Sequence, residues 1–143
     1  MDELVGSEVI CKTAEETRAF GMRFAKFLPP NQFVALVGDL GSGKTTFVRG
    51  MAAGFGIHAA VTSPSFNILN TYSGNATLLH ADAYRLDGTE YASSSLMLED
   101  FLTEPYCLVV EWPERLHGFL ETCDFIITFE LSGKYRKITA KKT

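Results

Sequence analysis

A glycine-rich stretch at residues 38–45 carries the clearest chemical signal in the sequence. It reads GDLGSGKT and satisfies the pattern GxxxxGK followed by Ser or Thr at every fixed position. Its glycines allow consecutive backbone N–H groups to point into one concave site, and a helix starting there adds its positive dipole end. Lys44 would reach the terminal phosphates, and the Thr45 hydroxyl would face Mg²⁺. The stretch therefore predicts a binding site for nucleotide phosphates.

A second group of hydroxyls follows in the segment TSPSF, residues 62–66. Nucleotide switches often place such a hydroxyl toward the metal or the terminal phosphate, and Pro64 stiffens the loop. A plain turn explains the same composition equally well. The residues expected to contact the nucleotide are Asp39, Leu40, Gly41, Ser42, Gly43, Lys44, Thr45, Thr46 and Thr62.

Two carboxylates stand where apolar strands end. Asp82 follows LLHA, and Glu111 follows CLVV. Because the carboxyl ends of parallel strands meet the same crevice, both side chains can converge on Lys44 and Thr45. The expected metal ligands are Thr45, Glu111 and Asp82, and the two acids are also the catalytic candidates. Either acid could hold Mg²⁺ while the other orients the attacking water, so their roles stay exchangeable.

His80 and Trp112 lie close to these acids in the sequence, and each is interpreted as a buried structural residue. His80 is expected to pack beneath the sheet rather than to act in catalysis. Trp112 is interpreted as a core residue, although it could stack on a base or on a partner. His58 and His117 show no metal-binding spacing.

The elements that must position these residues follow from apolar patterning. A capping box at Thr13 and Glu16 predicts a helix that ends before Pro29. A second helix follows the glycine loop to Gly54 or Gly56, and further helices are expected at residues 89–102 and 113–120. Strands are expected at residues 8–12, 33–37, 66–72, 76–81, 106–112, 124–131 and 135–140.

This order predicts an α/β protein with the three-layer fold of P-loop nucleotide hydrolases. The continuous apolar runs at 33–37 and 106–112 suit central strands that are covered on both faces of a parallel sheet. The Ser-Gly turns near residues 73 and 132 favour hairpins, so antiparallel strands should be added to a mostly parallel centre.

Length and composition favour one cytosolic domain. A chain of 143 residues with 46% hydrophobic residues can bury a single core, so residues 1–143 are expected to form one domain. The acidic start MDELVGSEVI lacks the basic region of a secretory signal, and no apolar run is long enough to cross a bilayer. The three cysteines, odd in number, are expected to be buried free thiols.

Basic residues concentrate near the carboxyl end. Residues 134–143 hold five of the thirteen Lys and Arg and no acid, so the remainder is acidic. An acidic body argues against autonomous binding to nucleic acid. The basic tail could touch phosphate or an acidic partner, or it could be a solvated chain end.

Three other classes of nucleotide-binding protein are alternatives to an ATPase. A GTP switch is disfavoured because the sequence has neither an NKxD segment nor a DxxG segment. A small-molecule kinase usually needs several arginines and a lid-sized insertion, and neither is apparent. A non-hydrolysing nucleotide-binding partner stays open, since Asp82 and Glu111 argue against it only weakly.

Four segments, in this order, resemble the TsaE family, also called YjeE: GDLGSGKTTFVRG, TSPSF, HADAYRL and EWPERL. The resemblance runs from about Glu8 to Glu130. That family comprises small bacterial P-loop ATPases that are needed to make threonylcarbamoyladenosine in certain tRNAs. Ser42 and Ser65 stand where the family often has alanine and threonine, and neither change removes a phosphate or metal group.

The resemblance implies both a site and partners. Lys44 and Thr45 would bind ATP and Mg²⁺, Thr62 would belong to a switch segment, and Asp82 and Glu111 would lie in the HxDxYR and EW motifs. The implied partners are similar to TsaD, which transfers the threonylcarbamoyl group, and to TsaB. ATP hydrolysis, slow alone, would reset their complex between turnovers. Contact with tRNA would then be indirect, and no membrane is involved.

Overall fold

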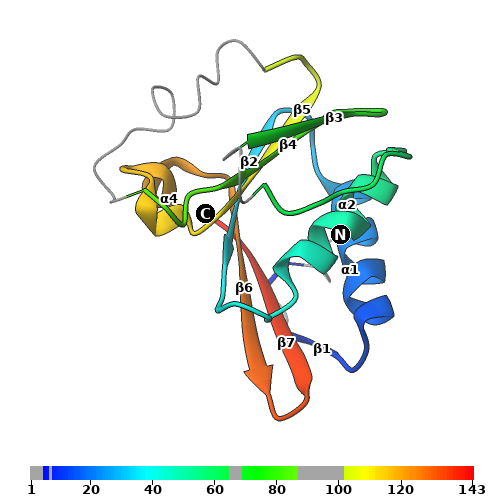
Figure 1. Ribbon diagram of the computed structural model, residues 1–143, viewed down its shortest axis with the longest axis vertical. Coiled ribbons are helices and arrows are strands. Elements are labelled where there is room, and N and C mark those ends of the chain that lie inside the picture. Colours follow the sequence, from blue (N-terminus) through cyan, green and yellow to red (C-terminus); the bar gives the residue numbers. More distant parts are fainter. Residues whose placement is uncertain (1–4, 7, 65–68, 87–101) are drawn as a thin grey trace.

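The computed structural model describes residues 5–6, 8–64, 69–86 and 102–143, which form one mixed sheet with helices on its faces (Figure 1). The strands are β1 Glu8–Cys11, β2 Gln32–Val37, β3 Leu69–Ser73, β4 Thr77–Asp82, β5 Tyr106–Glu111, β6 Phe125–Ser132 and β7 Tyr135–Lys142. The helices are α1 Ala14–Phe27, α2 Lys44–Gly54, the 3₁₀ turn η2 Pro113–Arg115 and α4 Phe119–Thr122.

Within the described residues, the sheet has seven strands in the order β1-β7-β6-β2-β5-β4-β3. Strand β2 pairs in parallel with β5 and β6, and β5 pairs in parallel with β4. The antiparallel pairs β3–β4, β6–β7 and β1–β7 extend this centre on both sides. The predicted α/β fold, with a mostly parallel centre and added antiparallel strands, is confirmed.

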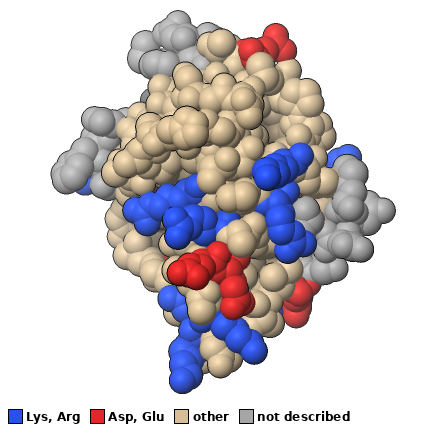
Figure 2. All heavy atoms as spheres, turned by 90° about the vertical axis from the view of Figure 1, so that its right-hand side faces the viewer, with Lys and Arg blue, Asp and Glu red and all other residues tan. Residues whose placement is uncertain are grey.

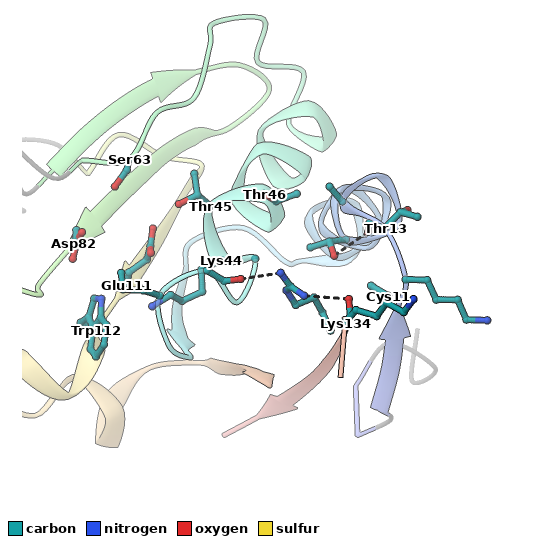
Figure 3. A pocket seen from close by; sticks show the side chains of 17 residues that line it. Cys11, Thr13, Lys44, Thr45, Thr46, Ser63, Asp82, Glu111, Trp112 and Lys134 are labelled. Carbon is teal, nitrogen blue, oxygen red and sulfur yellow. Dashed lines mark hydrogen bonds between the residues drawn. The ribbon is translucent and has the colours of Figure 1, made fainter. Parts of the chain in front are cut away.

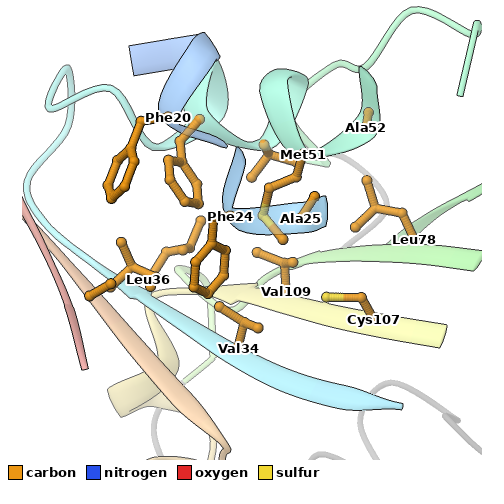
Figure 4. Packing of buried hydrophobic residues seen from close by; sticks show 14 of the residues in the cluster. Phe20, Phe24, Ala25, Val34, Leu36, Met51, Ala52, Leu78, Cys107 and Val109 are labelled. Carbon is orange, nitrogen blue, oxygen red and sulfur yellow. The ribbon is translucent and has the colours of Figure 1, made fainter. Parts of the chain in front are cut away.

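The central strands are apolar throughout because both of their faces are covered. Val34 and Leu36 of β2 pack in one core cluster beneath α1 and α2, whereas Ala35 between them packs in a second cluster with residues of α4. All three side chains are fully buried. Figure 4 shows Val34 and Leu36 facing the helical residues Phe20, Phe24 and Met51. This packing fixes the end of β2, from which the glycine loop leaves.

Helix α1 begins and ends where its sequence predicts. The N-terminal cap is Thr13, whose Oγ1 accepts a hydrogen bond from the backbone N–H of Glu16 at 3.1 Å. The Glu16 carboxylate in turn accepts from the backbone N–H of Lys12 at 3.0 Å, one residue before the cap. The helix ends at Phe27, before Pro29. The capping box therefore holds the first turn of α1 in place.

Glycines bring α1 and α2 into close contact. A Cβ atom built on Gly50 of α2 would lie 2.0 Å from the carbonyl oxygen of Arg18, and one on Gly21 of α1 would lie 2.2 Å from that of Phe47. Neither approach leaves room for a side chain. The tight crossing anchors α2, whose first residue is Lys44, against the rest of the core.

Some predicted elements differ from the structure. Residues 113–120 form two short helices instead of one, because Gly118 adopts a φ of 78° between η2 and α4. The expected hairpin is present, with β3 starting at Leu69. Residues 66–68 of that predicted strand lie outside the described residues. The predicted helix at 89–102 falls almost entirely on residues 87–101, which also lie outside the described residues.

The basic carboxyl-terminal segment is part of the sheet. The strand predicted at residues 135–140 is present as β7, Tyr135–Lys142, which lies between β1 and β6 and pairs with both, so the alternative of a solvated chain end does not hold for this segment. The physical reason is alternation: Ile138 and Ala140 are fully buried on one face, while Lys137 on the other face forms an ion pair with Glu130 at 3.0 Å.

Cys11, Cys107 and Cys123 are buried free thiols, as predicted. No helix among the described residues is long and apolar enough to cross a membrane. Seen from the side of α1 and α2, Lys and Arg side chains gather across the middle of the surface (Figure 2). Exposed basic residues of these helices are Arg18, Arg23, Lys26 and Arg49.

Candidate functional site

The glycine loop turns sharply between β2 and α2. Gly41 and Gly43 have φ values of 78° and 103°, a left-handed conformation that side-chain-bearing residues rarely adopt. Gly43 is the N-terminal cap of α2, and its carbonyl accepts a hydrogen bond from the backbone N–H of Phe47 at 3.0 Å. The amide groups at the start of α2 are thus available at the loop, an arrangement that suits an anion at the positive end of the helix.

Lys44 reaches back across this loop. Its Nζ donates a hydrogen bond to the Gly38 carbonyl at 2.6 Å and lies 4.4 Å from the centroid of the Trp112 ring. The residue is only 5% exposed. The ammonium group is therefore held over the loop by a carbonyl and an aromatic face, both of which attract a cation.

The two candidate acids lie side by side at one sheet edge. Asp82 and Glu111 are register partners on the parallel strands β4 and β5. Both line the same cavity as Lys44 and Thr45, and Figure 3 shows the four side chains grouped toward one end of it. The convergence expected from the strand ends is what the structure displays.

This cavity has a volume of about 410 Å³ and extends beyond the acids. At one end it is lined by Ser63, Asp82, Glu111 and Trp112 (Figure 3). Its other end lies between the start of α1 and the start of β7, and the residues there are Cys11, Lys12, Thr13, Thr17, Lys134 and Arg136. Between them lie the loop and helix residues Leu40, Gly41, Gly43, Lys44, Thr45 and Thr46.

Three residues predicted to contact nucleotide do not line this cavity. Asp39 and Ser42 border a separate hollow against β6. Thr62 is engaged through its backbone, whose N–H donates to the Tyr72 hydroxyl at 3.3 Å, and the neighbouring Ser63 lines the cavity instead. The hydroxyl-rich loop reaches the cavity through Ser63, one position further along than the predicted Thr62.

Trp112 also departs from its sequence interpretation as a core residue. It is half-buried, adopts a φ of 56° and lines the cavity directly after Glu111. Tyr84 packs against it edge-on, with ring centroids 5.0 Å apart. Arg115 supports Tyr84 through a hydrogen bond from Nη1 to its carbonyl at 3.0 Å. This edge-on contact supports the indole ring beside Lys44.

Hydrogen bonds orient both carboxylates. The backbone N–H of Tyr84 donates to Asp82 Oδ1 at 2.9 Å. Glu111 Oε2 lies 2.5 Å from His80 Nε2, and His80 is fully buried. Burial beneath the sheet was predicted for His80, whereas its contact with Glu111 was not. The spacing His-x-Asp contained the signal, because residues two apart on a strand share a face.

The oxygen donors at this end of the cavity fit Mg²⁺. The Thr45 hydroxyl and the carboxylates of Asp82 and Glu111 are hard oxygen ligands, and one Glu111 oxygen remains beside the one that His80 contacts. No cluster of three or more His, Cys, Asp or Glu able to hold a metal occurs among the residues that the structure describes. A site with two carboxylates suits Mg²⁺, which usually completes its coordination with waters and substrate phosphates.

The family model of the threonylcarbamoyl adenosine biosynthesis protein TsaE matches residues 11–139. The chain belongs to the TsaE family. A tRNA threonylcarbamoyladenosine biosynthesis protein TsaE from Treponema pallidum is 35% identical to it over 122 residues, which are 85% of this chain and 88% of that protein. Its counterpart from Rickettsia bellii is 39% identical over 122 residues, 84% of this chain and 83% of that protein.

A solved structure agrees with this TsaE membership. The crystal structure of YdiB from Bacillus subtilis is similar with a TM-score of 0.73 and 31% identity, covering 96% of this chain and 86% of YdiB. In this TsaE-family chain, all four segments that carried the resemblance contribute to the one cavity. They supply the loop with Lys44, the hydroxyl of Ser63, the carboxylate of Asp82, and Glu111 with Trp112.

Proposed function

We propose that this chain is a Mg²⁺-dependent ATPase that supports formation of threonylcarbamoyladenosine in tRNA. The observation that carries the proposal is the meeting of Lys44, Thr45, Asp82 and Glu111 in one cavity at the start of α2. Hydrolysis of a nucleoside triphosphate requires phosphate-binding groups and carboxylates within reach of one another. The role in tRNA modification comes from the family and from the names of the relatives.

The loop and the cations of the cavity would bind the triphosphate. Backbone amides around Gly43 would donate to phosphate oxygens, while Lys44 would leave the Gly38 carbonyl for the terminal phosphates. Lys134 and Arg136 line the opposite end and add positive charge toward the same anion. These groups support binding of a polyphosphate at the loop.

The acidic end of the cavity would carry the chemistry. Thr45, Asp82 and Glu111 would hold Mg²⁺, directly or through water, and the bound ion would neutralise charge that develops on the phosphate oxygens. One of the two carboxylates would orient the water that attacks the γ-phosphorus and accept its proton, while the bond from the γ-phosphorus to the bridging oxygen breaks and ADP leaves. Trp112 lines this end of the cavity, and Tyr84 packs edge-on against it.

The partners proposed are proteins similar to TsaD and TsaB, and the setting proposed is the cytoplasm. Hydrolysis would reset their threonylcarbamoyl-transfer complex, which explains why an ATPase works without a second substrate. Contact with tRNA would pass through these partners.

The test is ATP hydrolysis by the purified chain, measured with and without purified TsaD and TsaB. We expect slow release of phosphate from the chain alone and stimulation by the two partners together. ATP that stays intact in both conditions would show a passive nucleotide-binding protein. Phosphate that appears on an added metabolite, detected as a mass shift, would show a kinase.

A further inference from the structure

A buried histidine contacts the catalytic end of the cavity from behind. His80 on β4 is fully buried, and its Nε2 lies 2.5 Å from Oε2 of Glu111. Glu111 is 5% exposed and lines the cavity. The proposed hydrolysis assigns no task to His80, although a polar ring in the core is costly unless its hydrogen bonding serves a purpose.

Strand register explains how His80 reaches Glu111 without entering the cavity. Asp82 is the register partner of Glu111 across β4 and β5, and His80 pairs with Val109. His80 and Asp82 share a face of β4 because they are two residues apart, so His80 is the diagonal neighbour of Glu111. Asp82 therefore flanks Glu111 at the cavity, while His80 contacts it from inside the sheet.

The hydrogen-bond pattern assigns the direction of this contact. Among the described residues, Nδ1 of His80 has no hydrogen-bond partner, whereas Nε2 faces a carboxylate oxygen. A carboxylate accepts and cannot donate, so the ring hydrogen belongs on Nε2. His80 thus donates to Glu111 and holds one of its two oxygens.

We propose that His80 is a positioning residue that fixes the orientation of the Glu111 carboxylate. The terminal torsion of a glutamate is broad, so packing of its carbon chain leaves the carboxylate plane free to rotate. The bond from His80 holds Oε2 toward the core and leaves Oε1 for Mg²⁺ or for the attacking water. The proposal rests on the proposed function of the site, and it assigns His80 no contact with substrate.

Three substitutions separate the hydrogen bond from the space that the ring fills. His80→Gln keeps a nitrogen donor at the reach of Nε2, His80→Asn places its nitrogen near the position of Nδ1, and His80→Leu removes the donor. We expect the Asn and Leu variants to lower kcat for ATP by about 10–100-fold, a range typical for loss of such a supporting bond. The KM for ATP should change little, and His80→Gln should recover most of kcat.

A second measurement does not depend on turnover. Binding of a non-hydrolysable ATP analogue is followed by calorimetry at increasing Mg²⁺ concentration. We expect His80→Leu to require more Mg²⁺ than wild type for full binding, while its binding of the analogue without Mg²⁺ stays unchanged. His80→Gln should behave like wild type.

Leu79→Ala is the matched control for loss of stability. Leu79 is fully buried on the same strand, but it packs in the other core cluster, away from Glu111. The proposal is overturned if His80→Leu keeps wild-type kcat and Mg²⁺ dependence, or if Leu79→Ala shifts both equally. If wild type binds the analogue with Mg²⁺ but never hydrolyses ATP, the proposed function fails while the binding comparison still decides the role of His80.

Discussion

Arg136 on β7 donates a hydrogen bond from Nη2 to the carbonyl of Gly41 at 3.0 Å, which joins the last strand to the phosphate loop across 95 residues of sequence. Arg136 has this reach because it shares a strand face with the buried Ile138, and that face is directed toward α1 and the loop. The carboxyl-terminal basic segment is thereby part of the candidate site.

Arg136→Ala should weaken binding of ATP. Loss of a charge-assisted bond to the loop and of one cation at the cavity should cost about 1.5–3 kcal/mol, or about 10–100-fold in Kd. Titration calorimetry with ATP measures the change. Lys137→Ala is the matched control, because Lys137 is the next residue on β7 but pairs with Glu130 on the opposite face. Equal effects of the two substitutions would mean that only overall charge matters.

Glu111→Gln and Asp82→Asn should separate binding from turnover. Each removes a carboxylate while keeping the shape of the side chain, so the phosphate contacts of Lys44 and the loop remain. We expect nucleotide binding to stay within a few-fold of wild type and kcat to fall by about 100-fold or more, as loss of a catalytic acid or base typically gives. Turnover is measured with the partner proteins present.

Glu114→Gln is the control for these acids, since Glu114 is exposed and lies three residues after Glu111 without lining the cavity. It should leave kcat unchanged. Wild-type hydrolysis by both cavity variants in the presence of the partners would contradict the proposed mechanism.

The single tryptophan should report nucleotide binding. Trp112 lies 4.4 Å from the Lys44 ammonium, a charge close enough to influence indole emission. Phosphate that draws Lys44 away from the ring should change the fluorescence in a saturable manner. Lys44→Met should lose most of this change, and its basal emission should differ from that of wild type. An unchanged emission during binding that calorimetry detects would show that Lys44 stays on the ring.

The sequence predicted the parts of the site that depend on local rules. Lys44 and Thr45 follow a strand and open a helix, and that context alone indicates a phosphate loop. Asp82 and Glu111 could be brought together because strand ends in a parallel sheet meet at one edge. The strands β2, which leads into the glycine loop, and β5, which ends at Glu111, were also readable, since both are buried on both faces and appear as unbroken apolar runs.

The remaining residues depend on tertiary contacts that no local pattern specifies. Arg136 reaches Gly41 only because β7 pairs between β1 and β6. Trp112 turns toward the cavity through a positive φ, which its residue type does not predict. The choice of Ser63 over Thr62 depends on backbone contacts such as the bond from Thr62 N–H to Tyr72. Composition could identify that loop but not the residue within it.

Cys107 should remain unreactive in the folded protein. Burial raises the pKa of its thiol well above the ordinary value of 9.0, so the thiol keeps its proton in the fold. The unfolded thiol ionises first, so this contribution to stability is complete below pH 9.0 and is lost as the pH rises above it. Urea unfolding on both sides of this pH should show less alkaline loss in Cys107→Ala than in wild type. Equal losses would assign the effect to other groups.

Gly50→Ala should destabilise the protein even though it improves intrinsic helix propensity. In an open helix, this change would stabilise by about 1 kcal/mol. Here the new Cβ would lie 2.0 Å from the backbone carbonyl oxygen of Arg18, which cannot move without separating α1 from α2. We expect a net loss of about 1–3 kcal/mol in the free energy of unfolding, measured by urea denaturation. Ala53→Gly, at an exposed position of α2, should cost only about 1 kcal/mol. A gain in stability for Gly50→Ala would show that the two helices can separate at little cost, and would weaken the inference that their crossing anchors Lys44.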